Sequence, residues 1–74
     1  MNLNTNKLNI MKLKIYSNQS NEIIHQMIIT NELLNEYDIN VKSDDFTELF
    51  ETELLNDIMN QNNINSSNVY YELK

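Results

Sequence analysis

The feature that most constrains the fold is a stripe of apolar residues in the second half of the chain. Large apolar side chains recur there at three- and four-residue spacing: Phe46, Leu49, Phe50, Leu54, Leu55, Ile58 and Met59. This spacing is typical of one face of an α-helix. Ser43 is a suitable N-cap, and Asp44 and Asp45 place negative charge where the helix dipole favours it. We therefore predict an amphipathic helix over residues 44–59.

A second element, MKLKIYS at residues 11–17, has the alternation of a strand. Met11, Leu13 and Ile15 point one way, and the two lysines between them point the other. A period of two with one apolar side is typical of a half-buried β-strand. The polar run 17–21, SNQSN, then indicates a turn.

Residues 22–37 fit two structures. As a helix, this segment places several of its apolar side chains roughly on one face. As a strand, its β-branched isoleucines suit a pleated surface, with 31–35 as a hairpin loop and 37–41 as the return strand. Both interpretations stay open, because such loops usually contain glycine and this chain has none. The tail 69–74, VYYELK, fits either an edge strand or a short helix capped by Ser66 or Ser67.

These elements predict an α+β fold in a single domain over residues 1–74. Its centre would be a small three-stranded antiparallel sheet with an amphipathic helix. The alternative is a β-α-β-α-β arrangement in which residues 22–37 are helical. A chain of 74 residues has room for one core and buries about 60% of the surface that its unfolded form exposes. Because cysteine is absent, disulfides cannot stabilise it.

Charge is distributed very unevenly. Nine of the eleven carboxylates fall within residues 31–57, against one lysine, Lys42. Like charges at i, i+4 spacing, such as Asp44 with Glu48 and Glu53 with Asp57, cost a few tenths of a kcal/mol per pair. The cluster is therefore either an acidic binding surface or a solvated face whose first acids match the helix dipole. A net charge of −6 repels nucleic acid and membranes and attracts basic partners.

Several classes of function are disfavoured. His25 is the single histidine and lies among apolar residues, which is typical of a packed side chain. Without glycine there is no phosphate-binding loop or EF-hand turn, and without cysteine there is no thiol nucleophile. We expect no enzyme activity, no metal and no cofactor. Neither a membrane-spanning apolar run nor a signal-peptide core is present, so we expect a cytoplasmic protein.

The stretch LKIYSNQSNEIIHQMIITNELLNEYDIN (13–40) is similar to the first strand and β-hairpin of a known family. It resembles the small acidic anti-CRISPR proteins of type II-A, which are prophage-encoded inhibitors of Cas9. The matching features are the strand LKI, a turn ending at 20–21, an Ile-rich strand, and Asn35-Glu36-Tyr37 at the opening of a return strand. The resemblance covers about residues 11–50. The chain departs from it at Leu33-Leu34, where the family's hairpin tip carries an acid followed by glycine. The amino-acid composition indicates an AT-rich genome, such as that of a low-GC bacterium, its phage or its plasmids, because residues with AT-rich codons such as asparagine are abundant and alanine, glycine, proline and arginine are absent.

The resemblance implies a stoichiometric inhibitor that mimics nucleic acid and blocks the PAM/DNA-binding groove of the Cas9–guide RNA complex. Glu36 matches a contacting glutamate of the family. The predicted partner-binding residues are Glu32, Glu36, Tyr37, Asp38, Asp44, Asp45 and Glu48. Two alternatives remain from the sequence: an antitoxin or immunity protein that neutralises a basic toxin, and a small homodimeric structural module built on exposed apolar strands.

Overall fold

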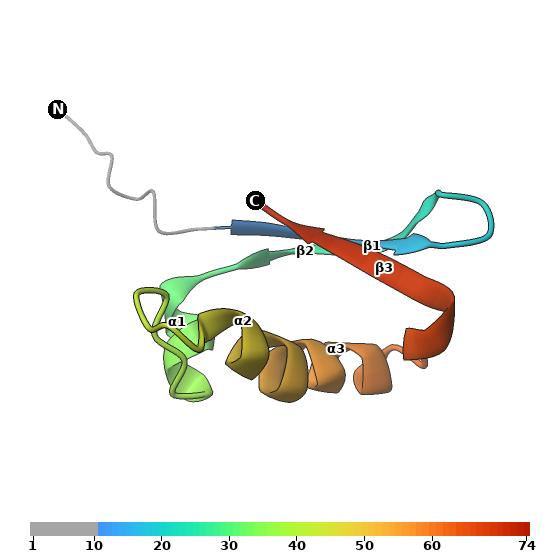
Figure 1. The fold of residues 1–74 in the computed structure, drawn as a ribbon. Coiled ribbons are helices and arrows are strands. Elements are labelled where there is room, and N and C mark those ends of the chain that lie inside the picture. The colour runs from blue at the N-terminus through green and yellow to red at the C-terminus, as the bar shows by residue number, and fades with distance from the viewer. Residues whose placement is uncertain (1–10) are drawn as a thin grey trace, which may run out of the picture.

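Residues 11–74 of the computed structural model form a three-stranded antiparallel sheet with helices covering one of its faces (Figure 1). Residues 1–10 lie outside the part of the chain that the structure describes. The elements in chain order are β1 (Met11–Ser17), β2 (Ile23–Ile29), α1 (Asn31–Glu36), α2 (Phe46–Leu49), η2 (Phe50–Leu55), α3 (Asn56–Gln61), η3 (Ser66–Asn68) and β3 (Val69–Leu73). The predicted α+β class, with its three-stranded sheet and its amphipathic helix, is confirmed.

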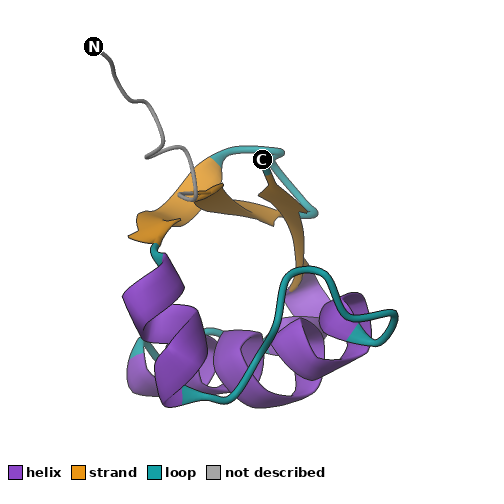
Figure 2. Cartoon of the chain, turned by 90° about the vertical axis from the view of Figure 1, so that its left-hand side faces the viewer, coloured by secondary structure: helices purple, strands orange, loops and turns teal. Residues whose placement is uncertain are grey.

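β1 is the central strand, and the strand order is β2-β1-β3. Leu13 lies opposite Met27 of β2 and Leu73 of β3, so the three strands align their apolar sides. Leu13 and Ile15 are fully buried, as the alternation in the sequence predicts. The other side of the sheet faces away from the helices (Figure 2).

The predicted turn after β1 is confirmed and closes a hairpin between β1 and β2. The Ser17 amide donates to the Glu22 carbonyl at 2.9 Å, and the Asn21 amide donates back to the Ser17 carbonyl at 2.8 Å. Asn21 has a φ of 61°. Asparagine tolerates this left-handed conformation better than most residues, which suits a chain that has no glycine to place there.

The segment 22–37 corrects both sequence-based interpretations. Its first part is the strand β2, which pairs with β1, so the all-helical alternative is wrong there. Its second part is the short helix α1, so the predicted hairpin loop at 31–35 and return strand at 37–41 are also wrong. The third strand of the sheet is the C-terminal β3 instead. The physical reason lies at Thr30, whose hydroxyl accepts from the Leu33 amide at 3.1 Å and caps α1, while Leu34 enters the core.

The amphipathic helix begins and ends two residues later than predicted. α2, η2 and α3 follow one another without a break from Phe46 to Gln61, and we call them together the long helix. Asp45 is the N-cap residue, and its side chain accepts no capping hydrogen bond. Ser43, predicted as the cap, lies in the preceding turn. There its carbonyl accepts from the Phe46 amide at 3.1 Å and its hydroxyl contacts the Asp45 carboxylate.

The middle of this helix, η2, is a π-helix. Its buried positions Phe50, Leu54 and Leu55 are followed by Ile58 of α3, so the apolar spacing is closer to four residues than to the 3.6 of an α-helix. A π-turn is wider than an α-turn and therefore keeps these positions on one side. The buried side of the helix thus faces the sheet along its length.

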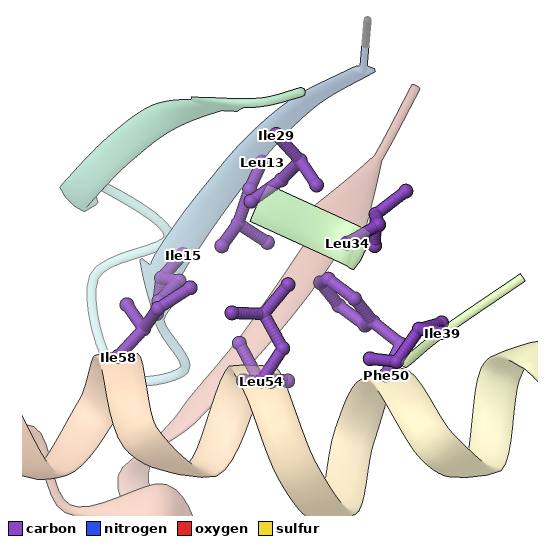
Figure 3. Close-up of a cluster of buried hydrophobic side chains, with 9 residues drawn as sticks. Leu13, Ile15, Ile29, Leu34, Ile39, Phe50, Leu54 and Ile58 are labelled. Atoms are coloured by element: carbon purple, nitrogen blue, oxygen red, sulfur yellow. The ribbon is translucent and has the colours of Figure 1, made fainter. Parts of the chain in front are cut away.

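The core lies between the sheet and the helices (Figure 3). Phe50 extends from the long helix toward the sheet, and its ring lies 5.8 Å from that of Tyr71 on β3 and 6.0 Å from that of Phe46. The buried hydrophobic residues are Leu13, Ile15, Ile29, Leu34, Ile39, Phe50, Leu54, Leu55 and Ile58. Every element that carries the acidic residues therefore packs on the same core.

Both main helices end in the same way, through a Schellman motif with a non-glycine residue in the left-handed region. At the end of α1, Asp38 has a φ of 55°, and the Ile39 amide donates to the Leu34 carbonyl at 2.9 Å. At the end of α3, Asn63 has a φ of 56°, and the Ile64 amide donates to the Met59 carbonyl at 2.8 Å. Glycine usually occupies this position, and Asn or Asp replaces it here.

Truncating the residue at the centre of the core should destabilise the protein strongly. We expect Phe50→Ala to lower the free energy of unfolding by about 3–5 kcal/mol, because it removes a fully buried ring and leaves a cavity. Thr47→Ala, at an exposed position of the same helix, should change it by less than about 0.5 kcal/mol. Urea unfolding followed by circular dichroism measures both. A loss below about 1 kcal/mol for Phe50→Ala would contradict the packing described here.

The left-handed conformation of Asp38 gives a second stability prediction. Asp38→Gly should be at least as stable as the natural protein, whereas Asp38→Ala should be about 1 kcal/mol less stable than Asp38→Gly, because its Cβ clashes at positive φ. Thermal unfolding of the two variants provides the comparison. Equal stabilities would mean that residue 38 does not hold this conformation in solution.

Candidate acidic binding surface

The carboxylates of residues 31–57 all lie on the helical side of the molecule, on α1, on the long helix and on the loop between them. We call these nine side chains the acidic layer: Glu32, Glu36, Asp38, Asp44, Asp45, Glu48, Glu51, Glu53 and Asp57. Lys12 and Lys14 lie on β1, and Lys74 follows β3. Most of the carboxylates of residues 11–74 therefore lie on the helical layer, whereas three of the four lysines of these residues lie on the sheet or directly after it.

The acidic layer is not neutralised by lysine within residues 11–74. The ion pair in this part of the chain joins Lys74 and Glu72 at 3.1 Å, and neither residue belongs to the acidic layer. Lys42 lies in the loop before α2 and forms no ion pair with an acid of the described residues. Unpaired carboxylates on one layer leave a strongly negative potential that a basic partner can use.

The predicted binding residues lie on α1, the loop after it and α2, rather than at the tip of a hairpin. Glu32 is in the first turn of α1 and Glu36 is its last residue. Asp44 and Asp45 precede α2, and Glu48 lies on it. Each of these carboxylates is exposed, as is that of Asp38. The hairpin interpretation of residues 22–41 would place Glu32, Glu36 and Asp38 at or beside the tip of that hairpin. This placement is wrong, because α1 occupies the segment predicted as the hairpin loop.

Asp38 is one of the residues that line an open hollow of about 530 Å³. The residues that line it are Asn31, Leu34, Asn35, Asp38, Ile39, Asn40 and Val41. Three of these side chains are amides, which can donate and accept hydrogen bonds, and one is a carboxylate. The hollow therefore offers a partner's guanidinium or ammonium group one charged acceptor with neutral acceptors around it.

Tyr37 connects α1 to the long helix. Its hydroxyl donates to Oδ2 of Asp57 at 2.9 Å, and its half-buried ring packs against the core. The hydrogen bond to this carboxylate raises the pKa of Tyr37, and burial adds to the effect. Because the Tyr37 hydroxyl already donates to Asp57, a partner could contact only the exposed part of the Tyr37 ring.

A second tyrosine fixes the other side of the long helix. The Tyr71 hydroxyl on β3 donates to Oε2 of Glu51 at 2.6 Å. Partial burial, followed by this hydrogen bond, raises the pKa of Tyr71 to about 12. Glu51 and Asp57 were not in the predicted binding set. The signal that points to them is the run of acids on the long helix without interleaved lysines.

His25 lies on the sheet, apart from the elements that carry the acidic layer. His25 is half-buried on β2, opposite Ile15 of β1. Within residues 11–74, no group of three Asp, Glu or His side chains could hold a metal ion. No helix in that part of the chain has the length and apolar character needed to cross a membrane.

Comparison of the chain with protein-family models, with curated proteins and with solved structures gives no match. The similarity to the anti-CRISPR proteins therefore stays a prediction from the sequence. The function proposed below depends first on the acidic layer itself.

The hydrogen bond between Tyr71 and Glu51 predicts a loss of stability in alkali. The pKa of Tyr71 is raised from 10.0 to about 12 in the folded protein. The contribution of the protonated Tyr71 hydroxyl to the free energy of unfolding is therefore fully present below pH 10 and disappears as the pH rises to about 12. We expect Tyr71→Phe to lose less stability than the natural protein across this range, by about 1 kcal/mol after allowance for solvent exposure.

Tyr70→Phe is the matched control, because the Tyr70 hydroxyl donates to the neutral amide of Asn21. Unfolding midpoints in urea at pH 9, 10, 11 and 12 measure the effect. Parallel pH profiles for Tyr71→Phe and the natural protein would show that the hydrogen bond to Glu51 does not contribute.

Proposed function

We propose that this protein is a stoichiometric inhibitor whose acidic layer occupies a basic nucleic-acid-binding groove of another protein. The observation that supports it is the concentration of nine carboxylates on the helical layer, without a lysine partner in residues 11–74. An arrangement selected for stability alone would intersperse lysines, because like charges on a helix repel one another. Unpaired charge of one sign is the arrangement that a partner of opposite charge requires.

The mechanism is displacement of nucleic acid without a chemical reaction. Arginines that read DNA bond bidentately to base edges in the major groove. A carboxylate offers a similar planar pair of acceptors with full charge, so its hydrogen bonds to arginine are stronger. Exposed carboxylates on α1, on the loop before α2 and on α2 would engage several basic side chains at once.

The partner that the sequence resemblance indicates is the guide-loaded Cas9 complex, at the groove that binds the PAM duplex. Cas9 reads the PAM with arginines in the major groove, which is the chemistry that a carboxylate can capture. We place the central contacts at Asp38, which lines the hollow, and at Glu36, the last residue of α1. The protein would then act in the cytoplasm of a bacterial host and need no cofactor.

Neutralising the central carboxylates should weaken binding to guide-loaded Cas9. We expect Glu36→Gln combined with Asp38→Asn to reduce the affinity at least tenfold, because hydrogen bonds to charged groups contribute about 1.5–3 kcal/mol each. Asparagine at 38 keeps the left-handed conformation, so the fold is preserved. Competition against a fluorescent PAM-containing duplex measures the affinity.

Glu22→Gln is the matched control, because Glu22 is an exposed acid of the hairpin turn between β1 and β2, outside the acidic layer. It should bind like the natural protein. Equal affinity for the double variant and this control would remove Glu36 and Asp38 from the interface. Absence of any binding to Cas9, together with tight binding to a basic ribonuclease toxin, would favour the antitoxin alternative instead.

A further inference from the structure

The strand β2 is an edge of the sheet, and its sequence is unusual for an edge. In residues 11–74 it pairs with β1 on one side, and no strand pairs with its outer side. Unpaired backbone amides and carbonyls on such an edge can form hydrogen bonds with another strand. Proteins usually protect an exposed edge with proline or with charged side chains such as lysine. The seven residues of β2, IIHQMII, contain no proline, lysine, arginine, aspartate or glutamate.

Three of the five large hydrophobic residues that are exposed in residues 11–74 lie on β2. Ile23, Ile24 and Ile28 are 45%, 48% and 45% exposed. Exposed apolar side chains that lie close together mark surfaces where another protein can bind. Because β2 has no Asp, Glu or Lys, it is also free of the repulsion that separates two copies of an acidic chain elsewhere. A second copy can approach here at low electrostatic cost.

The order of residues in β2 makes the strand complementary to itself. In an isologous antiparallel pair, a two-fold axis at the middle residue matches each position with its mirror position in the second copy. The middle of β2 is Gln26. The pairs across the axis would be Ile23 with Ile29, Ile24 with Ile28, and His25 with Met27. Apolar residues therefore meet apolar residues at both ends.

We propose that two copies of the chain associate through β2, antiparallel and two-fold symmetric about Gln26. Each copy contributes a three-stranded sheet, so the pair forms one continuous sheet with the helices of both copies on the same side. From His25 to Ile29 the register of β2 with β1 is unbroken, and the irregularity lies beyond, toward Ile23. This leaves the acidic layers directed away from the sheet that joins the two copies.

A cysteine at the axis gives the sharpest test, because the natural chain has no cysteine. Residues that face each other across an antiparallel pair have Cα atoms about 4.5–5.5 Å apart, which is within the range for a disulfide. We expect Gln26→Cys to form a covalent dimer under mild oxidation at least tenfold faster than Gln61→Cys, an exposed control on α3. Equal rates would overturn the proposed axis.

Sedimentation equilibrium then tests the surface itself. Ile28→Lys should weaken self-association at least tenfold, because each interface would gain two ammonium groups among apolar side chains, whereas Val41→Lys should not weaken it. Val41 is the control because it is a comparably exposed β-branched residue, 44% exposed, in the loop before α2. Added salt should strengthen the association by screening the acidic layers. A chain that is monomeric at millimolar concentration, or a dimer broken by Val41→Lys and not by Ile28→Lys, would overturn the proposal.

Discussion

The structure depends on the burial of one helix face against one side of a small sheet. Phe50, Leu54 and Ile58 project from the long helix toward Leu13 and Ile15 at the centre of the sheet (Figure 3). Such a small chain has no disulfide and buries a limited area, so this contact provides most of its stability. Because the apolar faces of the helices are used inward, their remaining faces are free to carry charge. The exposed acids of the acidic layer lie on these remaining faces and on the loop between the helices.

Asparagine and aspartate take the role that glycine has in most folds. Asn21, Asp38 and Asn63 hold the three positive φ values among residues 11–74, at one hairpin turn and two helix ends. At Asp38 the same residue ends α1, lines the hollow and presents a carboxylate. Structure and proposed function are therefore joined at one position, and variants there must separate charge from backbone conformation.

Strong apolar periodicity predicted the strand β1 and the long helix, and through them the fold class. The polar run 17–21 predicted the turn after β1. The segment 22–37 failed because its isoleucines satisfy two periods, and the decision between them came from the Thr30 cap and from the burial of Leu34. Tertiary pairing also decided the tail, since β3 gains its partner only when β1 is in place. The structure places the acids of the predicted binding set on the helical layer. The hydrogen bonds from Tyr71 to Glu51 and from Tyr37 to Asp57 could not be predicted from the sequence, because each joins residues 20 positions apart.

In the proposed complex the helical layer, and not the sheet, faces a basic groove. Amide hydrogen exchange of the protein, free and bound to guide-loaded Cas9, tests it most directly because it maps the contact along the whole chain. We expect slower exchange in α1, in the loop before α2 and in α2, with β3 unchanged. Protection confined to β2 or β3, with α1 and the loop as free as in the unbound protein, would contradict it.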